Sequence, residues 1–128
     1  MPVSDADALR IDGLLRANVA RVFNERDPER RLAALRELWA ESPSMFEVEE
    51  CFVGHEAISG NVGALLARLP AGVRFTPAGP AIVNHDAAML RWTASTEGNP
   101  PKVTGTDLAF IVDGRISRMY VFLDPHDL

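Results

Sequence analysis

Asp107 is the residue whose position most strongly suggests chemistry. It lies in the run V-T-G-T-D-L-A-F-I-V (103–112), which is otherwise rich in the apolar and β-branched residues of a strand. A bare charge is too costly to bury, so this carboxyl group must be solvated, paired or functional. In an apolar cavity its pKa would rise, and a neutral acid can donate a hydrogen bond to a substrate carbonyl or a developing enolate. The structural alternative is an ion pair with Arg91 or Arg118.

The hairpin around Asp113-Gly114 predicts the neighbours of this carboxyl group. Asp-Gly favours a two-residue type I′ turn, because both central residues need positive φ. Pairing outward from that turn, with Asp107 opposite Tyr120, assigns directly paired residues to one face of the sheet. We expect this face to line a cavity, and it carries Asp107, Ala109, Ile111, Ile116, Arg118, Tyr120 and Phe122.

The rest of the chain supplies helices first and strands afterwards. Apolar residues at helical spacing predict helices over 6–24, from Pro28 to about Ala40, and over 55–69, with Asp27 as the N-cap of the second. Short strands are expected over 45–48 and 51–53, and longer ones over 73–83, 87–95 and both arms of the hairpin. Pro77 and Pro80 interrupt the strand over 73–83. This order predicts an α+β domain whose helices cover one face of a curved antiparallel sheet.

Composition bounds the function classes. The chain has 128 residues, a net charge of −5 and one cysteine, Cys51. We therefore expect a single domain over 1–128, no nucleic-acid partner, no membrane association and no disulfide framework. The acidic start has no apolar signal-peptide region, and no apolar run approaches the ~20 residues of a membrane span. These features predict a soluble, cytoplasmic protein.

Other reactive residue types offer weaker candidates. No nucleotide-binding, zinc-protease or serine-hydrolase motif occurs, and the three histidines lack metal-ligand spacing, so no cofactor and no metal are expected. His85 is expected at the surface, in a turn. His55 is expected in the first turn of the third helix. Cys51 has no evident histidine partner and is expected to be a small buried apolar group.

Several motifs taken together resemble the nuclear transport factor 2-like, or SnoaL-like, superfamily. They are W-A-E-S-P-S-M-F-E-V, F-V-G-H-E-A-I, V-T-G-T-D-L-A-F and D-G-R-I-S-R-M, and the resemblance covers residues 9–124. It implies a cone-shaped barrel, in which a strongly curved antiparallel sheet wraps around the N-terminal helices with an apolar pocket at the open end. It also implies a homodimer that pairs through the sheet. Ketosteroid isomerases, polyketide cyclases, epoxide hydrolases and non-catalytic modules share this fold, so function must be argued from the site.

The resemblance also implies roles for two carboxyl groups. Asp107 falls where the isomerases carry their acid, and Glu47 falls where they carry a proton-shuttling carboxylate. Two carboxyl groups in unequal environments could divide acid and base work. The chain departs from the isomerases in having no tyrosine on its first helix. It departs from the epoxide hydrolases in keeping Arg91 but lacking both of their acids.

These observations lead to a hypothesis with an open alternative. The chain is predicted to bind a small hydrophobic molecule and, if it is an enzyme, to act on a carbonyl compound as an isomerase or cyclase without a cofactor. Asp107 and Glu47 are the expected catalytic residues. The expected substrate-binding residues are Tyr120, Arg91, Trp39, Phe46, Phe52, Trp92 and Phe122. The alternative is a non-catalytic ligand-binding or dimerisation module, in which Asp107 is structural and Glu47 lies at a solvated rim.

Overall fold

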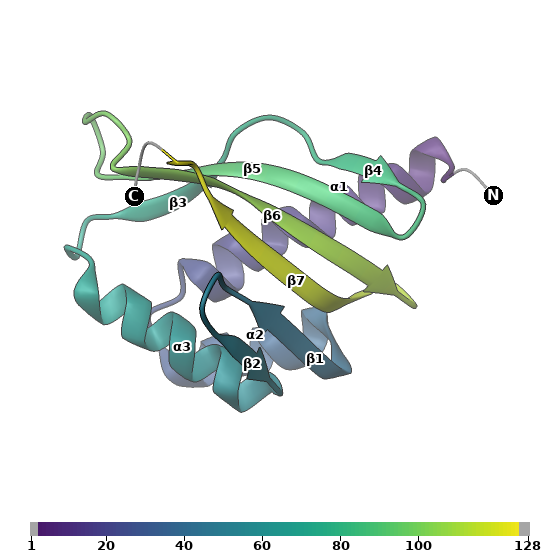
Figure 1. The fold of residues 1–128 in the computed structure, drawn as a ribbon, viewed down its shortest axis with the longest axis horizontal. Helices are drawn as coiled ribbons and strands as arrows, with labels where there is room; N and C mark the ends of the chain where they lie inside the picture. Colours follow the sequence, from purple (N-terminus) through teal and green to yellow (C-terminus); the bar gives the residue numbers. More distant parts are fainter. Residues whose placement is uncertain (1–2, 126–128) are drawn as a thin grey trace.

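The computed structural model of the chain describes residues 3–125 and contains helices packed against one curved sheet (Figure 1). The helical elements are α1 (Asp5–Asn18), the π-helical turn η1 (Val19–Phe23), α2 (Pro28–Leu38) and α3 (His55–Arg68). The strands are β1 (Trp39–Phe46), β2 (Cys51–Val53), β3 (Arg74–Pro77), β4 (Ile82–Asn84), β5 (Ala87–Ser95), β6 (Val103–Val112) and β7 (Arg115–Leu123). No helix within 3–125 is long and apolar enough to cross a membrane.

The helices α1 and α2 begin at residues whose side chains accept hydrogen bonds from free backbone N–H groups. The backbone N–H of Asp7 donates to Ser4 Oγ over 3.1 Å, and that of Arg30 donates to Asp27 Oδ2 over 2.9 Å, so both residues act as N-caps. The first helix, expected over 6–24, changes from α-helical to π-helical after Asn18. At its end Asn24 exchanges two hydrogen bonds of 2.7 Å with the backbone of Phe75. These bonds fix the helix end against β3.

The sheet has the strand order β2-β1-β7-β6-β5-β3, with β4 also paired to β5. It is curved and does not close into a complete barrel. All pairs are antiparallel except β1 with β7, which run parallel. The region expected as one strand over 73–83 forms two separate strands, and Pro80 lies in the gap between them. The first strand begins at Trp39, earlier than the expected 45, so Glu41-Ser42-Pro43 belongs to the sheet.

The hairpin between β6 and β7 contains a bulge that changes the expected register. Val112 pairs with Arg115 and Ile111 with Ile116, as predicted, but Phe110 then pairs with Arg118. Ser117 is the extra residue, and its Oγ donates a 3.0 Å hydrogen bond to the carbonyl oxygen of Phe110. From this point toward Asp107, every pair is displaced by one residue.

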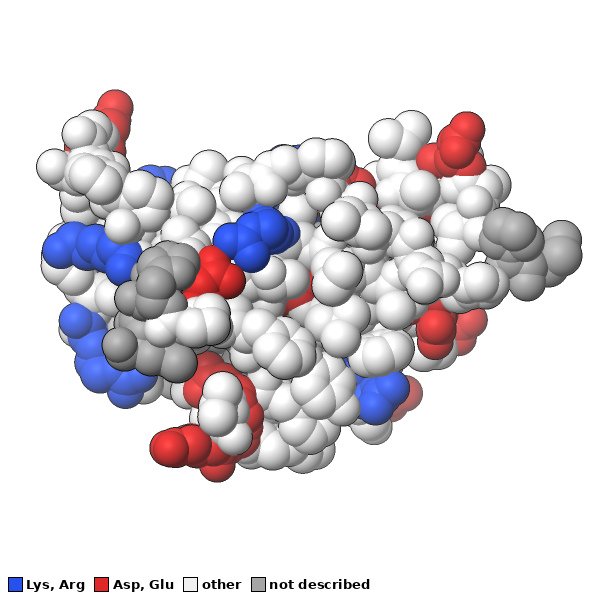
Figure 2. Space-filling model, turned by 45° about the horizontal axis from the view of Figure 1, so that its top comes forward, with Lys and Arg blue, Asp and Glu red and all other residues white. Residues whose placement is uncertain are grey.

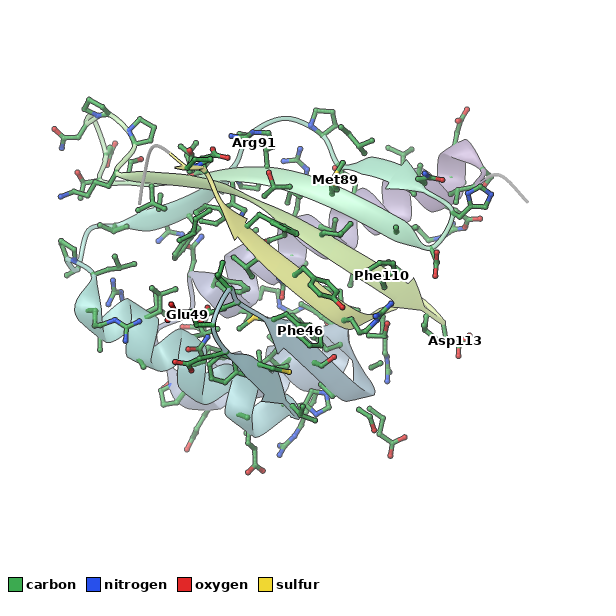
Figure 3. All side chains as sticks on the ribbon, in the orientation of Figure 1. Phe46, Glu49, Met89, Arg91, Phe110 and Asp113 are labelled. Carbon is green, nitrogen blue, oxygen red and sulfur yellow. The ribbon has the colours of Figure 1, made fainter. Side chains whose placement is uncertain are left out.

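The displacement reverses the face assigned to three side chains of β7. Asp107 pairs with Val121, while Arg118, Tyr120 and Phe122 share the outer face with Phe110. The prediction that these three residues lie on the Asp107 face is therefore wrong. Figure 2 shows a face with few charged side chains across its middle, and Figure 3 shows Phe46, Met89 and Phe110 on the outer side of the sheet.

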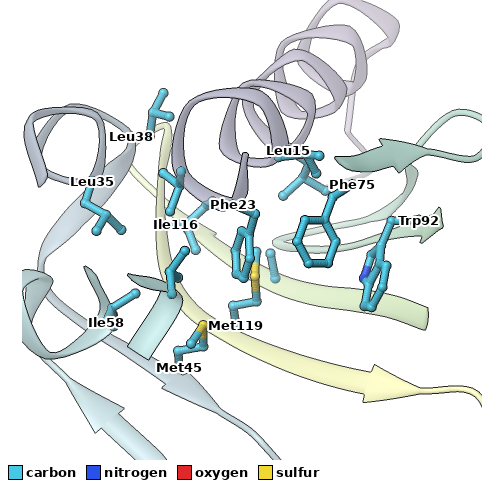
Figure 4. Packing of buried hydrophobic residues seen from close by; sticks show 14 of the residues in the cluster. Leu15, Phe23, Leu35, Leu38, Met45, Ile58, Phe75, Trp92, Ile116 and Met119 are labelled. Atoms are coloured by element: carbon cyan, nitrogen blue, oxygen red, sulfur yellow. The ribbon is translucent and has the colours of Figure 1, made fainter. Parts of the chain in front are cut away.

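The inner face of the sheet packs against the helices to form the hydrophobic core (Figure 4). Met45, Ile116 and Met119 are fully buried there against Leu35 of α2 and Ile58 of α3. A buried polar pair ties α1 to β1, because the indole N–H of Trp39 donates to Asn18 Oδ1 over 2.8 Å. The core therefore joins the concave face of the sheet to all three α-helices.

Candidate functional site

A cavity of about 600 Å³ lies between the concave face of the sheet, η1, α3 and the loop joining β1 to β2. This size falls within the range of roughly 300–1,000 Å³ that is typical of small-molecule sites. Its lining residues are Val19, Phe23, Glu47, Val48, Glu49, Glu50, Leu65, Arg68, Leu69, Phe75, Trp92, Ala94, Val103, Asp107, Val121 and Leu123. Most of the wall is apolar, and the charged groups other than Asp107 come from the β1–β2 loop and from the last turn of α3.

Asp107 lies on the inner face of β6 and is 5% exposed. The indole N–H of Trp92 donates a 2.9 Å hydrogen bond to its Oδ1. Burial raises the pKa of this carboxyl group to about 7, and the hydrogen bond from Trp92 opposes that rise. Asp107 is thus a buried acid that changes charge near neutral pH.

Among residues 3–125, Asp107 has no cationic partner. Arg91 extends from the outer face of β5 and pairs with Asp124 over 2.7 Å. The guanidinium of Arg118 lies 4.3 Å from the ring centroid of Phe110, also on the outer face. The alternative in which Asp107 forms an ion pair with Arg91 or Arg118 is therefore wrong.

The indole of Trp92 reaches Asp107 because its cross-strand neighbour is a glycine. Trp92 pairs with Gly105, and a Cβ at Gly105 would lie 2.5 Å from the indole and 2.5 Å from the carbonyl oxygen of Phe122. Trp92 also packs edge-on to Phe75, with ring centroids 5.4 Å apart, and Phe75 packs in the same way on Phe23. These aromatic contacts fix the orientation of the indole N–H.

Glu47 also lines this cavity, from the loop between β1 and β2. It follows β1 in a tight turn, where its backbone N–H donates to the carbonyl oxygen of Glu50 over 2.8 Å. Asn61 of α3 donates a 3.1 Å hydrogen bond from Nδ2 to Glu47 Oε2. Both expected catalytic residues line the cavity, and their surroundings differ, since Asp107 is buried and Glu47 is only partly so.

Most of the expected substrate-binding residues lie elsewhere. Trp92 lines the cavity, as Asp107 does. Trp39 is fully buried in the core, and Phe52 packs against that core without lining the cavity. Phe46 stacks on Tyr120 with ring centroids 4.6 Å apart on the outer face. Phe122 and Arg91 also lie on the outer face, so neither reaches the cavity.

The wall includes apolar residues that sequence reasoning did not select. Val19 and Phe23 belong to the apolar stripe that predicts a helix over 6–24, and Leu65 and Leu69 belong to the stripe that predicts one over 55–69. Their spacing marked them as inward-facing, but spacing alone does not separate residues that fill a core from residues that border a cavity.

The remaining candidates have no place in this site. Cys51 is exposed, so the expectation that it is buried is wrong. His85 is exposed in the turn before β5 with φ 54°, and its Nδ1 lies 2.7 Å from Asn84 Oδ1. His55 lies in the first turn of α3, as expected. Within residues 3–125, no group of three or more His, Cys, Asp or Glu side chains is arranged to hold a metal ion.

Comparisons with known proteins point to one family. The model of the SnoaL-like domain matches residues 16–119. A structure from Agrobacterium tumefaciens strain C58, provisionally assigned as an isomerase of the SnoaL-like family, has a TM-score of 0.82 at 25% identity, covering 91% of this chain and 98% of that one. Among curated proteins, no match was found.

Two further structures share the fold at lower identity. A protein from Jannaschia sp. CCS1, provisionally assigned as a SnoaL-like polyketide cyclase, has a TM-score of 0.75 at 15% identity, covering 97% of this chain and 91% of that one. A protein from Kribbella flavida DSM 17836, provisionally assigned as a ketosteroid isomerase, has a TM-score of 0.67 at 18% identity, covering 91% and 78%.

Proposed function

This chain belongs to the SnoaL-like domain family, and we propose that it catalyses proton transfer next to a carbonyl group of a small hydrophobic molecule, as an isomerase or a cyclase. The observation that carries this proposal is the buried acid. Asp107 lies in an apolar wall without a counter-ion, and only one of its two oxygens has a hydrogen-bond partner within residues 3–125. Such a group is suited to donate a hydrogen bond to an oxygen on which charge develops.

The two carboxyl groups divide the chemistry between them. Protonated Asp107 donates a hydrogen bond from Oδ2 to the substrate carbonyl oxygen, while the Glu47 carboxylate removes a proton from the adjacent carbon. The electron pair of that C–H bond forms the enolate, whose oxygen Asp107 stabilises. In an isomerisation, Glu47 then returns the same proton to another carbon of the conjugated system. In an aldol cyclisation, the enolate carbon attacks a second carbonyl, and that oxygen takes the proton.

A bicyclic β,γ-unsaturated ketone tests the proposal, because its conversion to the conjugated enone is followed by ultraviolet absorbance. We expect Asp107→Leu and Glu47→Gln each to lower the rate by about 10²- to 10⁴-fold, since the first removes the hydrogen-bond donor and the second removes the base. Glu49→Gln is the matched control, since Glu49 lies in the same loop, is exposed and has no assigned part in the reaction. Unchanged rates in both test variants would overturn the acid/base roles of Asp107 and Glu47, whereas a parent protein without turnover would favour the non-catalytic binding module.

We also propose that the chain acts as a cytoplasmic homodimer. The outer face of the sheet supports the dimer, since Phe122 is 52% exposed and Met89 is 41% exposed there. The single cysteine is compatible with a reducing compartment. The net charge of −5 does not favour binding to nucleic acid.

A further inference from the structure

The part of the cavity wall between the sheet and the helices contains few side chains that can form hydrogen bonds with a ligand. Among the described lining residues, the side chains with polar atoms are Asp107 and Trp92 on the sheet and four at the mouth. Those four are Glu47, Glu49, Glu50 and Arg68. The other lining side chains are apolar. A ligand seated between the sheet and the helices therefore meets hydrogen-bonding side chains only at Asp107 and Trp92.

The hydrogen bond between these two residues reduces the available groups further. The indole N–H of Trp92 is its only polar hydrogen, and Asp107 Oδ1 accepts it over 2.9 Å. The backbone groups of β6 around Asp107 are also engaged, because β6 is paired along its length with β5 on one side and β7 on the other. Oδ2 of Asp107 is the atom that remains.

We propose that the cavity selects ligands that carry a single oxygen function on the part they bury and that are otherwise apolar and uncharged there. This inference rests on the proposed function, because the single oxygen is the carbonyl oxygen to which Asp107 donates a hydrogen bond. A second buried oxygen would lose its hydrogen bonds to water and gain none from the wall. Polar groups are tolerated only at the end of the ligand that lies among the charged residues of the mouth.

Three saturated bicyclic probes of nearly equal shape test this selection: trans-decalin, trans-1-decalone and trans-decalin-1,5-dione. Their dissociation constants are measured by ligand-observed NMR in the absence of turnover. We expect the monoketone to bind about tenfold more tightly than the dione, since an unsatisfied buried oxygen typically costs a factor of about 5 to 150. Equal or tighter binding of the dione would overturn the inference, as would failure of all three probes to bind.

Substitutions of Asp107 show whether its carboxyl group is the source of the preference. The ratio of monoketone to decalin affinity should fall at least tenfold in Asp107→Leu, whereas Asp107→Asn retains a donor and should keep the parent ratio. Comparing ratios cancels the different hydration of the two ligands. Glu29→Gln, at an exposed position of α2 outside the cavity lining, should leave the ratio unchanged. An unchanged ratio in a folded Asp107→Leu variant contradicts the inference.

Binding and turnover separate this inference from the proposed function. A preference for the monoketone without turnover of any enone leaves the selection intact and removes the catalytic proposal. Turnover of substrates that bury two oxygens, at rates equal to those with one, overturns the selection and leaves the catalytic proposal intact.

Discussion

In the pH range where Asp107 of the folded protein loses its proton, the same side chain in the unfolded chain is already deprotonated. Its pKa is about 7 in the folded protein and 3.8 as an unperturbed side chain. Between these values the folded state binds a proton that the unfolded state does not, so stability falls as pH rises. The contribution is fully present below about pH 4 and is lost above about pH 7.

Asp107→Asn should remove this pH dependence while keeping an oxygen to accept the Trp92 hydrogen bond. We expect the variant to become more stable than the parent as the pH rises from 4 to 7. The difference in their free energies of unfolding should grow by about 1.4 kcal/mol per pH unit and reach roughly 4 kcal/mol at pH 7. Urea denaturation of both proteins at several pH values measures the difference, in which all other titrating groups cancel. A gap that stays constant with pH would contradict the assignment.

Trp92 should set the pKa of Asp107, because its N–H stabilises the charged carboxylate. Trp92→Phe keeps an aromatic ring and removes the donor, so the pKa should rise by about one to two units, as expected for a hydrogen bond to a charged group. The pH at which turnover is lost should rise with it. Titration of ¹³C-labelled aspartate by NMR follows the pKa directly, with or without activity.

Trp39→Phe is the matched control for that experiment. It also removes a buried indole N–H, the one that donates to Asn18 over 2.8 Å, but in the core away from the cavity lining. This variant should lose stability and leave the pKa of Asp107 unchanged. An equal pKa in Trp92→Phe and the parent protein would show that the hydrogen bond has no such role.

At the scale of elements, β6 and β7 approach each other closely at Gly105. A Cβ there would meet the carbonyl oxygen of Phe122 at 2.5 Å, and a backbone atom cannot move aside as a flexible side chain can. Gly105→Ala should therefore lower the free energy of unfolding by about 1–3 kcal/mol, the usual cost of overpacking. Thermal or urea denaturation measures the loss.

Gly60 provides the control for this substitution. It lies on the exposed side of α3, where an added Cβ meets nothing within 4 Å. Gly60→Ala should stabilise the protein by up to about 1 kcal/mol, because alanine is the better helix former. Destabilisation by both substitutions to the same degree would indicate that the close approach at Gly105 is not the cause.

The elements could largely be predicted from the sequence, whereas the register of the last hairpin could not. Helical periodicity and the Asp27-Pro28 pair located the helices, and Asp113-Gly114 located the turn between β6 and β7. The bulge at Ser117 is accompanied by one side-chain hydrogen bond to the opposite strand. No local sequence pattern predicts this bulge. Because of that single extra residue, Tyr120 and Phe122 lie on the outer face and not on the predicted Asp107 face.

The same distinction applies to the candidate site. Asp107 could be recognised because a charge in an apolar strand needs an explanation, and Glu47 through the family resemblance. The close packing at Gly105 and the hydrogen bond from Trp92 could not be predicted from the sequence. They depend on the pairing of β5 with β6 and on the direction of an indole ring.

On the scale of the whole molecule, the two faces of the sheet have different environments. The concave face is covered by helices and carries the cavity. The outer face carries a continuous row of paired positions, Met89, Leu108, Tyr120, Phe46 and Cys51, that runs from β5 to β2. Phe122 and Phe110 flank this row, and no element of the described chain covers it. An apolar sheet face of this kind is typical of a surface that another protein covers.

The proposed homodimer places two copies of this face together. Sedimentation equilibrium at micromolar concentration should give the mass of two 14.0 kDa chains. Phe122→Glu should shift the protein to monomer, because a carboxylate buried opposite an apolar partner lacks a counter-charge. Leu9→Glu is the control, since Leu9 is an apolar residue of α1, 73% exposed, and lies on the helical side of the molecule. A parent protein that sediments only as monomer, or a Leu9→Glu variant that dissociates equally, would contradict pairing through the sheet.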